Sequence, residues 1–159
     1  MKKKIIIATI LALMIAAVSV LAVACGGGTT LEEGSYSGTY KCSYTADGET
    51  KYVGCKAAFD VDDANNIWDI TVTALEAEGD ITYTSPSLGQ RPWDSGKILG
   101  QFSGAWTVDE FMKINVTIDA NGVAKIESSK EITVGVGFEL GTAVVILAVQ
   151  NGIQSALDA

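Results

Sequence analysis

Two extended stretches joined by an Asp-Gly pair place the strongest constraint on what this chain can fold into. Ser35 to Thr45 and Lys51 to Val61 are typical of β-strands, and Asp47-Gly48 between them is a hairpin signal. Strands joined by so short a connection must run antiparallel, because a parallel pair needs a long crossover. The sequence therefore predicts an antiparallel hairpin at the start of its folded part.

The rest of the chain indicates an α+β fold, a small antiparallel sheet of hairpins with a buried C-terminal helix and one or two short helices. Further strands are expected at Ile67 to Ala74, after a turn at Asp62 to Asn66, and at Ile114 to Asp119 and Val123 to Glu127, around an Asn121-Gly122 turn. Helices are expected at Pro92 to Phe102, after the capping-box sequence Thr107 to Glu110, and at Thr142 to Leu157. In the last helix the first half is apolar all round, and the later polar face comprises Gln150, Asn151, Gln154 and Ser155.

The N-terminus has the layout of an export signal. Lys2 to Lys4 precede an uncharged run from Ile5 to Ala24, which ends at Cys25. Leu21 to Cys25 resembles a bacterial lipobox, which implies that Cys25 is lipidated and becomes the first mature residue. The alternative is an uncleaved membrane helix, since a run of this length can span a bilayer. We expect a signal at 1–24, a lipidated cysteine and flexible tether at 25–33, and a domain at 34–159 on the extracytoplasmic face of the cell membrane.

Charge and composition exclude several classes of function. The chain has 19 Asp and Glu against 11 Lys and Arg, and removal of the three N-terminal lysines leaves 8 - 19 = -11. Such a surface argues against nucleic acid and against anionic lipid, so the membrane partner is expected to be reached through the lipid anchor. The absence of histidine excludes Ser-His-Asp units and histidine metal ligands.

The acidic residues give no metal or catalytic site. Asp60 to Asn66 lacks the glycine and the closing glutamate of a calcium loop, so a solvated turn is expected and no metal is predicted. No pair of carboxylates is placed for acid and base roles, and no catalytic residue is assigned. Trp68, Trp93 and Trp106 are expected to be core or rim aromatics.

Whether the two cysteines of the domain can form a disulfide depends on the register of the first hairpin. A four-residue loop at Asp47 to Thr50 places Cys42 opposite Cys55, whereas a two-residue turn at Asp47-Gly48 places Cys42 opposite Val53. The first register, in an oxidising compartment, predicts a structural disulfide. A redox-active pair is disfavoured because the Cys-x-x-Cys spacing is absent.

The two ends of the domain carry a resemblance to a known family. The opening Gly34 to Tyr40 (Gly-Ser-Tyr-Ser-Gly-Thr-Tyr) is similar to that of the FMN-binding domain of Rnf-type and sodium-translocating quinone reductases and of Gram-positive surface lipoproteins. Ile146 to Asn151 resembles the helix that follows the flavin-attachment motif. Trp93, the Ile98 to Phe102 stretch and Ser103-Gly104 stand in an order similar to the lipoprotein branch. The resemblance implies FMN as cofactor, electron transfer and redox partner proteins, with no reaction on a substrate of its own.

The attachment motif departs from the family pattern. In the family a threonine carries FMN through a phosphoester, and the matching position here is Glu139, which has no hydroxyl. A second partial match at Ser103 to Thr107 has tryptophan in the threonine position. The residues that the resemblance assigns to FMN are Ser103, Thr107, Gly137, Glu139, Gly141 and Thr142.

Three outcomes for flavin stay open at this point: noncovalent FMN, some covalent attachment, or a scaffold that has lost flavin. A helix that begins near Thr142 offers its positive end to a phosphate, and Glu139 competes for the same end. The leading hypothesis is a lipid-anchored flavin-binding or electron-transfer protein. The alternative is a flavin-free surface module that binds a ligand or a protein on the same scaffold.

Overall fold

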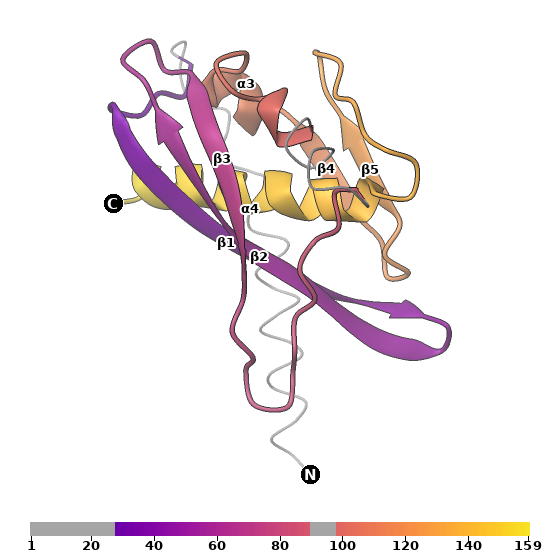
Figure 1. The fold of residues 1–159 in the computed structure, drawn as a ribbon. Helices are drawn as coiled ribbons and strands as arrows, with labels where there is room; N and C mark the ends of the chain where they lie inside the picture. Colours follow the sequence, from indigo (N-terminus) through magenta and orange to yellow (C-terminus); the bar gives the residue numbers. More distant parts are fainter. Residues whose placement is uncertain (1–27, 90–97) are drawn as a thin grey trace.

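A long hairpin and one further strand make a three-stranded antiparallel sheet. The structure, a computed structural model, describes residues 28–89 and 98–159. In it β1 (Gly34–Ala46) and β2 (Glu49–Val61) each have 13 residues, and β3 (Ile67–Ala74) has 8. The strand order is β1, β2, β3, so β2 is central and β1 and β3 are the edges of the sheet (Figure 1).

The turn at Asp47 and Gly48 sets the register of the hairpin. Both residues have positive φ angles, 55° and 76°, as a two-residue type I′ turn requires. Cys42 therefore faces Val53. The four-residue loop that would place Cys42 opposite Cys55 is wrong, because the chain reverses at the Asp-Gly pair itself.

The structure also differs from the disulfide that this loop would allow. Cys42 and Cys55 are free thiols, and Cys55 faces Tyr40, so the two cysteines are diagonal neighbours on one face. Diagonal neighbours lie about 7–8 Å apart, beyond the roughly 5.5–6 Å that separates the Cα atoms of most disulfides. A bridge between them would require one strand to slide along the other.

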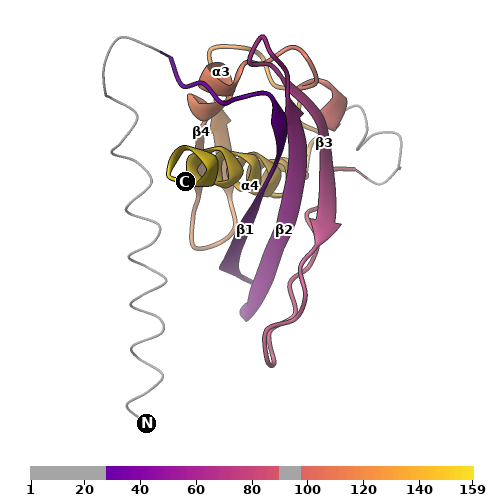
Figure 2. The same ribbon diagram turned by 90° about the vertical axis from the view of Figure 1, so that its left-hand side faces the viewer.

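The C-terminal helix α4 (Glu139–Leu157) covers the inner face of this sheet. Figure 2 shows it between β1 and β2 on one side and β4 (Asn115–Ile118) on the other. Alternate side chains of β2 point toward the helix and are buried: Val53, Cys55, Ala57, Phe59 and Val61. From α4 the buried side chains include Val144, Val145, Val149 and Ile153. Burial of this apolar surface is the main stabilising contribution to the fold.

Two glycines allow α4 to cross β1 at backbone contact. A Cβ atom on Gly38 would lie 2.1 Å from the carbonyl oxygen of Ala148 and 2.2 Å from the backbone nitrogen of Gly152. Beside this crossing the Asn151 side chain donates from Nδ2 to the carbonyl oxygen of Thr39 at 2.9 Å. The crossing fixes where the helix lies along the hairpin.

A further layer packs on the side of α4 that faces away from the three-stranded sheet. It consists of the short helix α3 (Val108–Met112) and a hairpin of β4 with β5 (Ala124–Glu127) (Figure 1). Thr107 and Glu110 form the capping box predicted from the sequence, with Glu110 N donating to Thr107 Oγ1 and Thr107 N donating to Glu110 Oε2. Helix α4 is therefore the central layer of the domain.

Gln150 connects α4 to this second layer. Its side chain is 7% exposed, and Nε2 donates to the carbonyl oxygens of Phe111 at 3.0 Å and Ile114 at 2.9 Å. The sequence had placed Gln150 on the exposed polar face of the helix, and this prediction is wrong. The amide is buried because it satisfies two carbonyl groups at the end of α3.

The α+β fold class and most of the predicted elements are confirmed. Strand β3 matches the predicted range, and α4 begins at Glu139, three residues before the predicted start at Thr142. For the helix predicted at Pro92 to Phe102, residues 92–97 lie outside the described part, and residues 98–100 are helical. Trp93, Cys25 and the predicted signal also lie outside it.

Candidate functional site

The residues that the resemblance assigns to flavin lie at two places, one of which is the start of α4. Gly137 has a φ of 86° and leads to Phe138, the N-cap residue, which makes no side-chain capping bond. Glu139 is the first residue of the helix and is exposed. Its carboxylate is placed where the helix dipole is positive, which is a stabilising position for a negative charge.

The next two residues of this set are buried. A Cβ atom on Gly141 would lie 1.9 Å from the carbonyl oxygen of Ser87, so the loop before residue 90 packs directly on the helix. Thr142 is 1% exposed, and its hydroxyl donates to the carbonyl oxygen of Phe138 at 3.0 Å. The hydroxyl nearest to Glu139 in the helix is therefore used within the first turn of α4.

Ser103 and Thr107 form the second place, before and at the start of α3. Ser103 Oγ accepts from the backbone N–H of Asp69 at 3.3 Å, and Thr107 Oγ1 belongs to the capping box. Both hydroxyls hold local structure. Within residues 28–89 and 98–159, no side-chain hydrogen bond joins these two residues to Gly137, Glu139, Gly141 or Thr142.

A hollow of about 340 Å³ opens elsewhere, where β1 begins and β2 ends. Its lining combines one indole with three carboxylates and comprises Glu33, Gly34, Ser35, Asp60, Val61, Asp62 and Trp68. A second hollow of about 310 Å³ lies on the β4–β5 hairpin. Neither contains a residue of the predicted flavin set.

Trp68 is the main feature of the first hollow, which we call the Trp68 hollow. Its side chain is 42% exposed, which is unusual for so large an apolar group. The indole Nε1 donates to Asp62 Oδ2 at 2.7 Å. A Cβ atom on Gly104 would lie 2.4 Å from the six-membered ring, so the ring rests on the Gly104 backbone. The indole is thus held in one orientation while part of its surface meets solvent.

The carboxylates of the Trp68 hollow differ in their hydrogen-bond partners. Asp62 accepts from the backbone N–H of Asn66 at 2.7 Å and of Ala64 at 3.1 Å, and so closes the turn before β3. The Asn66 N–H, followed by the Trp68 indole, lowers the pKa of Asp62 below its ordinary value. Asp60 is exposed and accepts from Ser35 Oγ at 2.6 Å. The hollow therefore presents negative charge beside an aromatic surface.

This hollow is assembled by tertiary geometry, so no sequence pattern predicts it. Asp62 to Asn66 forms the predicted turn, whereas Trp68, predicted to be a core or rim aromatic, lines the hollow. A β-bulge between Ala58 and Asp60 shifts the pairing of β2 with β3. The positive φ of Asp69, 50°, follows directly after Trp68. The available signal was a tryptophan two residues after a polar turn and directly before an aspartate.

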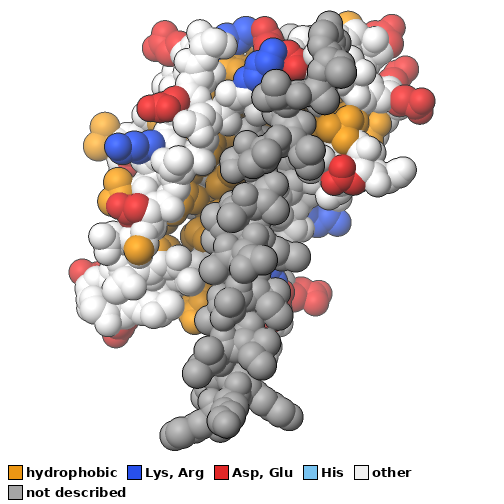
Figure 3. Space-filling model, turned by 180° about the vertical axis from the view of Figure 1, so that it is seen from behind, with side chains coloured by type: hydrophobic (Ala, Val, Ile, Leu, Met, Phe, Trp, Pro, Cys, Tyr) orange, Lys and Arg blue, Asp and Glu red, His pale blue; other side chains and the backbone are white. Residues whose placement is uncertain are grey.

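Acidic side chains are also common outside this hollow. Figure 3 shows them spread around the visible outline of the domain. Within the described ranges, no three His, Cys, Asp or Glu side chains are grouped so that they could hold a metal ion. Among the described helices α4 is long and apolar enough to cross a membrane, yet 61% of its most apolar 18-residue stretch is buried, as is common for a core helix.

Comparison of the chain with protein-family models, with curated proteins and with solved structures found no match.

Proposed function

We propose that this chain is a lipid-anchored, extracytoplasmic binding module without covalent flavin, and that its Trp68 hollow binds a cationic group of a partner. The exposed indole beside three carboxylates is the observation that carries this proposal. We assign no catalytic residue, and propose that the module acts by binding.

The contacts of the flavin set favour the flavin-free form of the fold. Thr142 and Thr107 use their hydroxyls in helix starts, and Ser103 uses its hydroxyl on β3. The Ser87 backbone occupies the space next to Gly141. An attached phosphate would have to displace these contacts.

The chemistry of the Trp68 hollow selects for positive charge. A Lys or Arg side chain over the face of a tryptophan gains about 0.5–1 kcal/mol at an exposed site, and more where it is desolvated. Carboxylates beside the ring add attraction that salt weakens. Because the ring is fixed by Asp62 and Gly104, little side-chain entropy is lost on binding.

NMR titration with N-acetyl-arginine methylamide tests the proposal. We expect the largest shifts at the Trp68 indole N–H and at the amides of residues 33–35 and 60–62, and weaker shifts at high salt. Glu33→Gln with Asp60→Asn should reduce the shifts while Asp62 keeps its turn. The matched control Glu127→Gln with Glu131→Gln removes two carboxylates outside the hollow and should leave them unchanged.

Two outcomes would contradict the proposal. One is equal shifts at acidic residues all over the domain, since these would show only general charge attraction. The other is equal shifts with N-acetyl-glutamate methylamide, since a site selective for cations must discriminate against an anion.

Noncovalent FMN is the second candidate, favoured by the start of α4. The N-cap residue Phe138 makes no side-chain capping bond, and Gly137, directly before it, has a positive φ angle. Backbone N–H groups at such a helix start can bind a phosphate. Bound FMN would supply the electron-transfer chemistry, with redox partner proteins as donor and acceptor.

Colour separates the two candidates. A flavin carrier purifies yellow, whereas the flavin-free module is colourless. Even with a flavin transferase coexpressed, the denatured protein should show no fluorescence in a gel, because Glu139 has no hydroxyl. Fluorescence that survives denaturation and maps to Thr107 or Thr142 would show that the attachment position was misassigned.

A further inference from the structure

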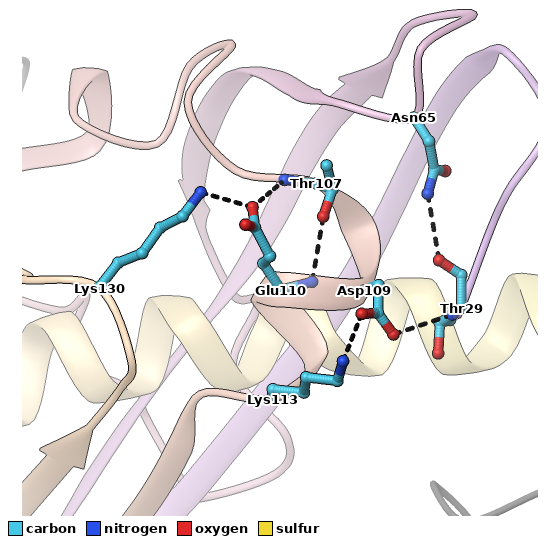
Figure 4. A network of polar contacts seen from close by, with 7 residues as sticks. All are labelled: Thr29, Asn65, Thr107, Asp109, Glu110, Lys113 and Lys130. Atoms are coloured by element: carbon cyan, nitrogen blue, oxygen red, sulfur yellow. Dashed lines mark hydrogen bonds and ion pairs between the residues drawn. The ribbon is translucent and has the colours of Figure 1, made fainter. Parts of the chain in front are cut away.

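The chain just before β1 is bound to the domain. Thr29 N donates to Asp109 Oδ1 at 2.9 Å, and the carbonyl oxygen of Thr29 accepts from Asn65 Nδ2 at 3.1 Å (Figure 4). Leu31 N donates to Asn65 Oδ1 at 3.0 Å, and the Leu31 side chain packs against the core. We call residues 29–31 the strap. The flexible tether predicted at 25–33 is therefore wrong for these residues.

The strap is bound at both of its edges by side chains that are themselves held. Asn65 has a φ of 66° in the turn before β3, and Asp109 pairs with Lys113 in α3 (Figure 4). The Lys113 ammonium, followed by the Thr29 N–H, lowers the pKa of Asp109. Asp109 is therefore ionised at neutral pH, and the strap is bound by a charge-assisted hydrogen bond.

The strap limits how far the domain can stand from a lipid on Cys25. Four residue steps separate Cys25 from Thr29, and a fully extended chain spans at most about 14 Å over that length. The Asp47-Gly48 turn lies at the opposite end of β1 and β2 from the strap (Figure 1). Thirteen residues of strand separate the two ends, which is about 40 Å.

We infer that the strap holds the domain end-on to the lipid surface. The end that carries Asn65, α3 and the Trp68 hollow faces the membrane, and the tip of the β1–β2 hairpin points away from it. This rests on the lipid anchor of the proposed function and deepens it: the Trp68 hollow opens close to the headgroups. Its cationic partner is then a basic protein segment at the membrane surface.

Energy transfer to the membrane tests this orientation. The mature chain from Cys25, with Cys42→Ala and Cys55→Ala, is coupled through Cys25 to a maleimide lipid in phosphatidylcholine vesicles that contain an acceptor-labelled lipid. A donor dye is placed by click chemistry at position 63, in the exposed turn beside Asn65, or at position 49, at the hairpin tip. We expect several-fold more transfer from position 63 than from position 49.

Two variants show whether the strap causes the difference. Eight Gly and Ser residues inserted between Gly27 and Gly28 lengthen the tether without touching the described domain, and should bring the two transfer efficiencies close together. Asn65→Gly with Asp109→Ala removes the strap contacts while glycine tolerates the positive φ of position 65, and should act in the same direction.

The outcomes separate the orientation from the proposed function. Equal transfer from positions 63 and 49 without any insertion would overturn the end-on orientation. So would a difference that persists in Asn65→Gly with Asp109→Ala, because the strap would then not be its cause, or one that persists after the insertion, because the short tether would then not be what limits the domain. Chemical coupling supplies the lipid, so neither result depends on lipidation in cells or on a cationic ligand.

Discussion

Gly38 and Gly152 show how a missing side chain can position a whole helix. Their backbones are in contact, with Gly152 N 2.2 Å from where a Cβ of Gly38 would lie. Any larger residue must push α4 away from β1, and with it the buried side chains that α4 shares with β2. Close packing of many atoms therefore stabilises the crossing of α4 over β1, and no single bond accounts for it.

Gly38→Ala is expected to lower the free energy of unfolding by about 1–3 kcal/mol or more, the usual cost of overpacking against an unyielding backbone. Urea unfolding followed by circular dichroism measures the change. Gly100→Ala is the matched control, because a Cβ there meets nothing within 4 Å. A Gly38→Ala protein as stable as the control would mean that the helix is not held at this crossing.

Helix α3 depends on one carboxylate with several partners. Glu110 accepts from the Thr107 backbone N–H at 3.0 Å and from Lys130 Nζ at 2.6 Å, and the same Nζ donates to the carbonyl oxygen of Ala105. Five residues cannot form a stable helix alone, so the cap and the ion pair with Lys130 hold α3 in place. The strength of this interaction also depends on pH.

Glu110→Gln should destabilise the domain at pH 7 and not at low pH. The Lys130 ammonium, followed by the Thr107 N–H, lowers the pKa of Glu110 below its ordinary 4.5. A lowered pKa stabilises the fold above about pH 4.5, and the contribution is lost as pH falls through the folded-state pKa. The expected loss at pH 7 is about 0.5–1 kcal/mol, because solvent screens the pair.

Urea titrations at pH 7 and at low pH, with Glu131→Gln as an exposed control, measure this difference. A deficit of equal size at both pH values would show that the carboxylate charge is not what stabilises α3.

The register of the first hairpin can be tested through its thiols. Material exported under oxidising conditions should contain Cys42 and Cys55 as free thiols. Both are poorly reactive when folded, because burial raises the pKa of Cys42 and raises that of Cys55 to about 12. Val53→Cys with Cys55→Ala places a thiol directly opposite Cys42 and should lose two hydrogens by forming a bridge.

Intact mass after alkylation of the unfolded chains decides the register. A disulfide between Cys42 and Cys55 in the native protein, with none in the engineered pair, would show that the hairpin has the four-residue loop instead.

At the scale of the whole molecule, the lipid anchor that we propose would account for how an acidic domain stays at a membrane. Without its three N-terminal lysines the chain has a net charge of 8 - 19 = -11, and anionic headgroups repel such a surface. In the end-on orientation that we infer, the end toward the lipid includes Glu33, Asp60 and Asp62 of the Trp68 hollow. Under this proposal, attachment comes from the lipid on Cys25 and not from the protein surface.

Cys25→Ser is expected to move the domain from the membrane fraction to the soluble fraction when it is expressed in a bacterial cell envelope. Fractionation and immunoblotting measure the distribution, and Cys42→Ser serves as the control for loss of a different thiol. Retention of the Cys25→Ser protein in the membrane would support an uncleaved helix at Ile5 to Ala24 instead.

The sequence by itself determined the local elements of this protein. Asn121-Gly122 and the capping box at Thr107 act over a few residues, so a turn and a helix start could be predicted from residue identity, and Asp47-Gly48 located the first turn without deciding its register. The apolar run of α4 likewise identified the buried helix. These features depend on backbone preference and periodicity, which are properties of a short segment.

Only the tertiary structure decided which residues meet. The burial of Gln150 depends on the carbonyl groups of Phe111 and Ile114, which are more than 30 residues away. The Trp68 hollow lies beside a bulge in β3, and the strap requires Asn65 from the turn before β3 and Asp109 from α3. Such contacts join segments that are far apart in the sequence, so no local pattern encodes them.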